Sequence, residues 1–266
     1  MLVIRPEQME AFEAAAIRAF EDRTYKHLQK YFPGHCLLLG EEQMRRVIQQ
    51  GWQKAKSHDL TAECCVRSYI EFMCRLGSGF DSDPLLPWAM EILNDKTTLD
   101  QIGRGDRLYD KAWDYIDHIA RDYRDATGRP TTARFVGELR RLRHERNDVL
   151  APGAIPSFSR DLIERIENVF PAKCRYVGEE RVSELIPRGI ETARAYGITT
   201  ERGVMLFTVL MFVLGNGFAD DLLLPWASAT LNDKGITNQI DRVDRLYVEG
   251  VGFLKRWWDL IPRQGD

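Results

Sequence analysis

Two acidic turns hold the residues best placed to bind a cation or a charged partner. Asp81 and Asp83 occur in the stretch FDSDP, and Asp220 and Asp221 occur in FADDL. A calcium-binding EF-hand that opened at Asp81 would need glycine at position 86 and glutamate at position 92, where the chain has leucine and isoleucine. We therefore expect no metal site here and interpret the four aspartates as a partner-binding surface.

Histidine and cysteine, the usual side chains of catalytic and metal sites, form no recognisable motif. The five cysteines lack a C-x-x-C spacing, the five histidines all lie in the first 144 residues, and no H-E-x-x-H, phosphate-binding or nucleophile-elbow motif occurs. In RRLRHERND, His144 and Asp148 could share a helical face as a nuclease pair, although a solvated basic helix is the favoured explanation. We predict no cofactor, and an enzyme only as the less favoured alternative.

Charge and hydropathy argue against nucleic-acid and membrane binding. The net charge of −3 divides into −4 for residues 1–127, +3 for 128–148 and −2 for 149–266. Nucleic-acid binding usually requires a basic face. The longest apolar run, 204–214, is too short to cross a bilayer, and the first residues do not resemble a secretory signal. These features favour a cytoplasmic protein.

The chain repeats itself at an offset of 138 residues. DPLLPWAMEILNDK begins at Asp83 and DLLLPWASATLNDK begins at Asp221, and 21 of the 34 residues in 76–109 are identical to those in 214–247. This is an internal tandem repeat, and each copy has the size of a domain. We predict a helical module in 1–127, a basic helical connector in 128–155 and a second module in 156–266.

Helical periodicity runs through both copies, and no segment alternates as a strand would. Apolar residues recur every three to four positions in 41–55, 61–76 and 102–123 and again in 240–261, and we expect further helices over 6–31 and 134–146. The expected fold is all-α, with two duplicated modules related by pseudo-two-fold symmetry.

The repeated phrase itself has the features of a short helix. Asp83 and Asp221 are suited to cap its start, and the prolines that follow are tolerated in a first turn. Trp88 and Trp226 come next as large side chains that would anchor each core. This structural interpretation stands beside the partner-binding one.

Several of these strings resemble a family of small helical proteins from Gram-negative bacteria. The similar strings are Gly40-Glu41-Glu42, AYGITTERGV, DSDPLLPWA and the Leu-Asn-Asp that ends the repeated phrase. The resemblance covers about one hundred residues of each copy. Genes of that family lie beside type VI secretion effectors, often ones with a PAAR-type tip domain.

The resemblance implies a role close to toxin delivery. The most specific expectation is a non-enzymatic immunity protein that binds a cognate effector toxin, such as a nuclease, and occludes its active site. An acidic chain suits a basic target groove. The alternative is an adaptor or chaperone that loads an effector onto the secretion spike.

Overall fold

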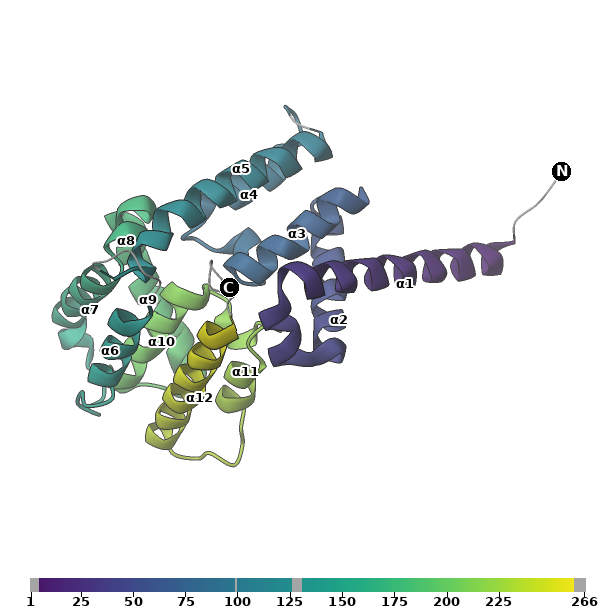
Figure 1. Ribbon diagram of the computed structural model, residues 1–266. Helices are drawn as coiled ribbons and strands as arrows, with labels where there is room; N and C mark the ends of the chain where they lie inside the picture. The colour runs from purple at the N-terminus through teal and green to yellow at the C-terminus, as the bar shows by residue number, and fades with distance from the viewer. Residues whose placement is uncertain (1–4, 99, 126–130, 261–266) are drawn as a thin grey trace.

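Helices form the whole framework of this computed structural model, which describes residues 5–98, 100–125 and 131–260. Within those ranges no strand is present, and Val149 and Thr200 form an isolated antiparallel β-bridge. The all-α prediction is confirmed (Figure 1). The α-helices are α1 (Pro6–Tyr31), α2 (Pro33–Ser57), α3 (Glu63–Leu76), α4 (Pro87–Asn94), α5 (Gln101–Ile119), α6 (Ala133–Leu142), α7 (Ile155–Val169), α8 (Pro171–Val177), α9 (Glu179–Ala195), α10 (Glu201–Leu214), α11 (Pro225–Leu231) and α12 (Gln239–Leu260).

A glycine with positive φ interrupts the chain at the same place in each copy. Gly40 has φ 75° and bends α2, while Gly178 has φ 91° and separates α8 from α9. Only glycine adopts this conformation without strain. The predicted helix over 41–55 is therefore the second part of a longer, bent helix.

Helices α1–α5 form the first half of the chain, and α6–α12 form the second. The last long helix of each half packs on the other half. α5 packs against α8, and α12 packs against α2. At the first contact Tyr115 and Tyr176 lie 5.3 Å apart between ring centroids. At the second, the rings of His35 and Trp257 are 4.0 Å apart. The buried apolar residues consequently form one continuous core that runs through both halves.

Trp88 and Trp226 pack as predicted, although neither is fully buried. Both lie against the core, with the Trp88 ring 6.3 Å from that of Tyr115 and the Trp226 ring 6.0 Å from that of Phe253. Their indole nitrogens are buried without a hydrogen-bond partner in the described part of the chain. They contribute apolar area at the edge of the core.

The basic segment between the copies is a packed part of the second half. α6 lies against α7, α10 and α12. Its residues Phe135, Leu139 and Leu142 are buried. Because α6 covers its outer side, α10 is buried from Arg202 through Phe212.

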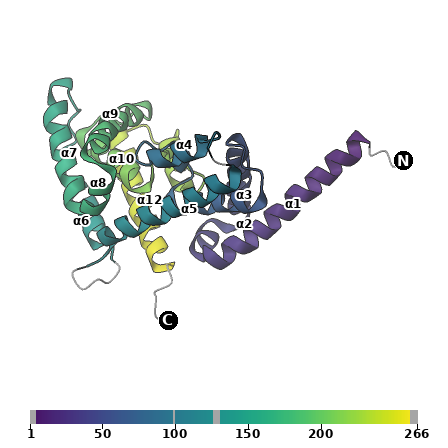
Figure 2. The same ribbon diagram turned by 90° about the horizontal axis from the view of Figure 1, so that it is seen from above.

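α1 extends beyond the body of the molecule. Its second part packs on α2, whereas its first turns project away from the other helices in both views (Figures 1 and 2). Phe12 is 64% exposed there. Amphipathic helices usually bury an apolar face. In Figures 1 and 2, no other described helix lies beside this projecting part of α1.

Candidate binding cleft

The acidic turns join the two halves. Asp83 accepts a hydrogen bond from the backbone N–H of Asn216, at 2.9 Å, and Asp221 accepts one from Ser78, at 2.8 Å. Each carboxylate also accepts from the amide two residues later, Leu85 or Leu223. The two aspartates therefore make equivalent bonds across the interface between the halves.

The predicted helix-capping role of these two aspartates is wrong. α4 begins at Pro87 and α11 at Pro225, and neither helix has a side-chain cap. The aspartates come four residues earlier, at the end of a short 3₁₀ turn. The prolines do occupy the first helical turn, where their missing N–H has no role.

Asp81 is the centre of a polar cluster in the first half. Its carboxylate accepts from the Tyr69 hydroxyl at 2.7 Å, and it lies 3.2 Å from Lys54 Nζ and 3.4 Å from His58 Nε2. Burial opposes ionisation, but the bonds from His58, Tyr69 and Lys54 outweigh it and lower the pKa of Asp81. The second half has alanine at the corresponding position 219.

Burial overturns the expectation that all four aspartates form an exposed surface. Asp81, Asp83 and Asp221 are buried. Burial also raises the pKa of Asp221, against the hydrogen bonds from Ser78 and Leu223. Charged groups are tolerated inside a protein only when they are paired in this way. Asp220 alone is exposed, and its carboxylate accepts a 3.0 Å hydrogen bond from Tyr196.

Two repeated arginines bind carbonyl groups rather than carboxylates. Arg104 Nη1 donates to His58 O and Leu93 O, each at 2.7 Å. Arg242 donates to Tyr196 O at 3.0 Å and to Ile236 O at 2.6 Å. Ion pairs in this region are made by other arginines, since Arg202 lies 2.8 Å from Asp244 and Arg107 lies 3.6 Å from Asp95. Arg104 and Arg242 thus hold loop carbonyl groups in place.

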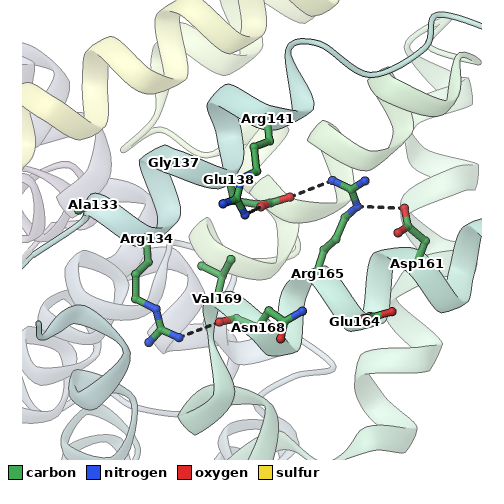
Figure 3. A pocket seen from close by; sticks show the side chains of 10 residues that line it. All are labelled: Ala133, Arg134, Gly137, Glu138, Arg141, Asp161, Glu164, Arg165, Asn168 and Val169. Atoms are coloured by element: carbon green, nitrogen blue, oxygen red, sulfur yellow. Dashed lines mark hydrogen bonds and ion pairs between the residues drawn. The ribbon is translucent and has the colours of Figure 1, made fainter. Parts of the chain in front are cut away.

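A charged cleft of about 490 Å³ opens between α6 and α7 (Figure 3). Two of its arginines are bonded across it: Arg134 donates to the Asn168 carbonyl at 2.8 Å, and Arg165 contacts Glu138 at 3.1 Å. The full lining consists of Ala133, Arg134, Gly137, Glu138, Arg141, Asp161, Glu164, Arg165, Asn168 and Val169.

Arg165 is the centre of charge in this cleft. It pairs with Asp161 at 2.9 Å and with Glu145 at 2.7 Å in addition to Glu138. Burial alone would lower the pKa of Arg165, but the three carboxylates outweigh it and raise the pKa. Glu164 is exposed at the rim and has no ionic partner in the described ranges. The cleft thus offers both signs of charge to a partner.

The proposed nuclease pair does not assemble on a helix. α6 ends at Leu142, so His144 and Asp148 lie in the following loop, and both are exposed. Asp148 pairs with Arg146 at 2.6 Å. The predicted helix over 134–146 is too long because the loop backbone turns to meet α10, where Asp148 O accepts from the Glu201 amide.

No sequence motif predicts the α6–α7 cleft. Its carboxylates are separated from its arginines by up to 30 positions, from Arg134 to Glu164, and no motif joins them. The basic composition of 134–146 was the only available signal. Across the described residues, no three His, Cys, Asp or Glu side chains converge as metal ligands.

Comparisons with known proteins identify no relative. No protein-family model, curated protein or solved structure matches the chain. In the described ranges, no helix combines the length and apolar character needed to cross a bilayer. Function must therefore be argued from the side chains themselves.

Proposed function

We propose that the chain is a duplicated, cytoplasmic binding protein that neutralises a type VI effector toxin. Duplication with pseudo-two-fold symmetry is supported by the offset of 138 residues and by the equivalent bonds of Asp83 and Asp221 across the halves. Symmetry-related contacts of this kind are typical of isologous interfaces. The toxin partner is suggested by the family resemblance of the repeated strings.

The α6–α7 cleft is the observation that most favours binding. Arg165 is paired there with Glu138 and Asp161, and a protein partner could exchange ion pairs with these side chains. Complementary charge at an interface gives specificity and speeds association. Its lining includes no histidine, cysteine, serine or lysine that could act as a nucleophile or general base near neutral pH.

The test is rescue of cells that express the toxin encoded beside this gene. Co-expression of the chain should restore growth, and the two purified proteins should form a complex at micromolar concentration. Glu164→Arg should slow association, because it reverses the unpaired charge at the rim of the cleft. Glu167→Arg is the matched control, since Glu167 is exposed on the same helix outside the cleft.

Two results would contradict the proposal in different ways. If no complex forms, the chain does not neutralise this toxin. If a complex forms without rescue, and deletion of the chain instead reduces toxin export, the chain is an adaptor that loads the effector.

A further inference from the structure

In the second half, α6 packs on a surface that other helices form, and we call this surface its seat. Phe135 and Leu142 of α6 lie beside Val209 of α10, and the Arg143 guanidinium lies 5.5 Å from the ring centroid of Tyr247 on α12. Arg202 donates to the Arg143 carbonyl at 3.2 Å. Three helices, α7, α10 and α12, therefore form the seat of α6.

The corresponding seat in the first half is formed by α1, α3 and α5. Among the described residues, no helix packs on it as α6 does on its counterpart. Tyr31 is 53% exposed, whereas its counterpart Val169 is 7% exposed under α6. Tyr109, the counterpart of Tyr247, is 50% exposed. The first half thus presents an open seat.

Side chains on α3 are adapted to an open seat. Where α10 has Met205 and Val209, both buried, α3 has Arg67 and Glu71, both partly exposed. Glu71 pairs with His27 at 2.8 Å. Polar side chains such as Arg67 and Glu71 can be solvated in the free protein. They can exchange ion pairs with a partner helix that binds there.

The charges on the α1 wall are reversed relative to α7. Asp161, Glu164 and Asn168 of α7 line the cleft beside α6. Their counterparts 138 residues earlier are cationic and exposed, namely Arg23, Lys26 and Lys30. Arg23 pairs with Glu63, while Lys26 and Lys30 have no carboxylate partner in the described part of the chain. A helix seated here should be acidic where α6 is basic.

We propose that the open seat on α1, α3 and α5 binds an acidic amphipathic helix of a partner protein. The inference rests on the proposed duplication and not on toxin neutralisation. Arg134, at the start of α6, bonds to Asn168, at the end of α7, so the seated helix should run antiparallel to α1. The apolar side of the partner helix would contact the first half as Phe135, Leu139 and Leu142 of α6 contact the second.

The seat continues along the projecting part of α1. Phe12, Ala16 and Ala19 are exposed and share the helical face of Arg23 and Lys26, at spacings of three and four residues. A partner helix longer than α6 could therefore contact this apolar stretch after passing the lysines. Projection of α1 from the body leaves that face open (Figure 2).

The seat can be tested with a peptide that imitates α6. The probe is residues 131–145 of this chain, carrying Arg134→Glu and Arg141→Glu, held helical by a bridge between positions 133 and 140. Positions 133 and 140 are exposed in α6, so the bridge lies outside the buried apolar side of the helix. The unaltered basic sequence with the same bridge is the peptide control. Binding to the full chain is measured by fluorescence anisotropy.

The expected result is saturable micromolar binding of the acidic peptide and at least about tenfold weaker binding of the basic one. Lys26→Glu combined with Lys30→Glu should weaken binding of the acidic peptide by about tenfold or more. Lys234→Glu combined with Lys255→Glu, at two exposed lysines of the other half, should not. The acidic peptide should also slow alkylation of exposed Cys64, whose counterpart Arg202 contacts the end of α6.

Absence of saturable binding would overturn the proposal. So would binding that the Lys26/Lys30 variant leaves unchanged, or binding without protection of Cys64, because the peptide would then lie elsewhere. Toxin rescue plays no part in these measurements, so a failed seat and a failed neutralising function can be told apart.

Discussion

At the residue scale, the repeated aspartates stabilise the interface between the halves. Asp83 and Asp221 each satisfy two backbone amides with one carboxylate, one amide nearby and one in the other half. A buried amide that loses its acceptor has no water to replace it. Two of the four aspartates first expected to contact a partner therefore stabilise the fold.

Asp83→Ala and Asp221→Ala should each lower the free energy of unfolding by about 1–3 kcal/mol, since each leaves a buried amide unpaired. Urea denaturation followed by tryptophan fluorescence measures this. Asp220→Ala is the control and should change the free energy by less than about 0.5 kcal/mol, because the side chain is exposed. Equal losses in all three variants would contradict the structural role assigned to the buried pair.

Buried Lys173 should make stability depend on alkaline pH. It donates to the Phe212 carbonyl and lies 4.4 Å from the centroid of that ring, and burial lowers its pKa to about 8. Between pH 8 and the ordinary lysine value, the unfolded chain binds more protons than the folded one. The contribution of Lys173 to the free energy of unfolding is thus complete above the pKa that this lysine has in the unfolded chain. It is lost as pH falls through about 8, the pKa in the folded protein.

Comparison with Lys173→Met isolates this contribution. The stability of the natural chain relative to Lys173→Met should rise from pH 8 to pH 10.5, by up to about 3 kcal/mol. Chemical denaturation at several pH values measures both proteins. A constant difference over this range would show that Lys173 is not perturbed by burial.

At the element scale, each half depends on one close helix contact at a repeated glycine. Gly51 of α2 faces Ile70 and Met73 of α3, and Gly189 of α9 faces Thr208 of α10. A methyl group at either position would overlap these side chains. The two helices can approach closely only because glycine has no side chain.

Gly189→Ala should destabilise the protein by about 1–3 kcal/mol because of this overlap. Gly137→Ala is the matched control: it also lies inside a helix, but a Cβ there would meet no atom within 4 Å. Alanine should stabilise α6 by about 0.5–1 kcal/mol at that position. Thermal unfolding of both variants measures the difference in sign, and destabilisation by both would contradict the packing explanation.

The elements were more predictable than their ends and partners. Periodicity identified α3, α5 and α12, because one apolar face recurs every 3.6 residues. It could not show that α6 ends at Leu142 or that the buried aspartates bond across the halves, since these features depend on contacts between distant segments. The α6–α7 cleft was missed for the same reason, and only the basic composition of its region was visible.

At the scale of the whole molecule, the halves are joined by contacts that each makes on the other. α5 reaches α8, α12 reaches α2, and the Asp122 carboxylate accepts from the amides of Ala172 and Lys173. The apolar core is continuous between them. Halves that share an apolar core should unfold together, whereas domains joined by small polar interfaces unfold separately.

The protein should therefore unfold in one transition. Far-ultraviolet circular dichroism, which follows all helices, and tryptophan fluorescence should give coincident midpoints, and the calorimetric and van 't Hoff enthalpies should agree. Asp83→Ala in the first half and Gly189→Ala in the second should each shift that single midpoint for both probes. If the interface were weak, each substitution would lower the stability of its own half, and two transitions would separate. That outcome would show that the shared core does not couple the halves, since a coupled interface transmits the loss from one half to the other.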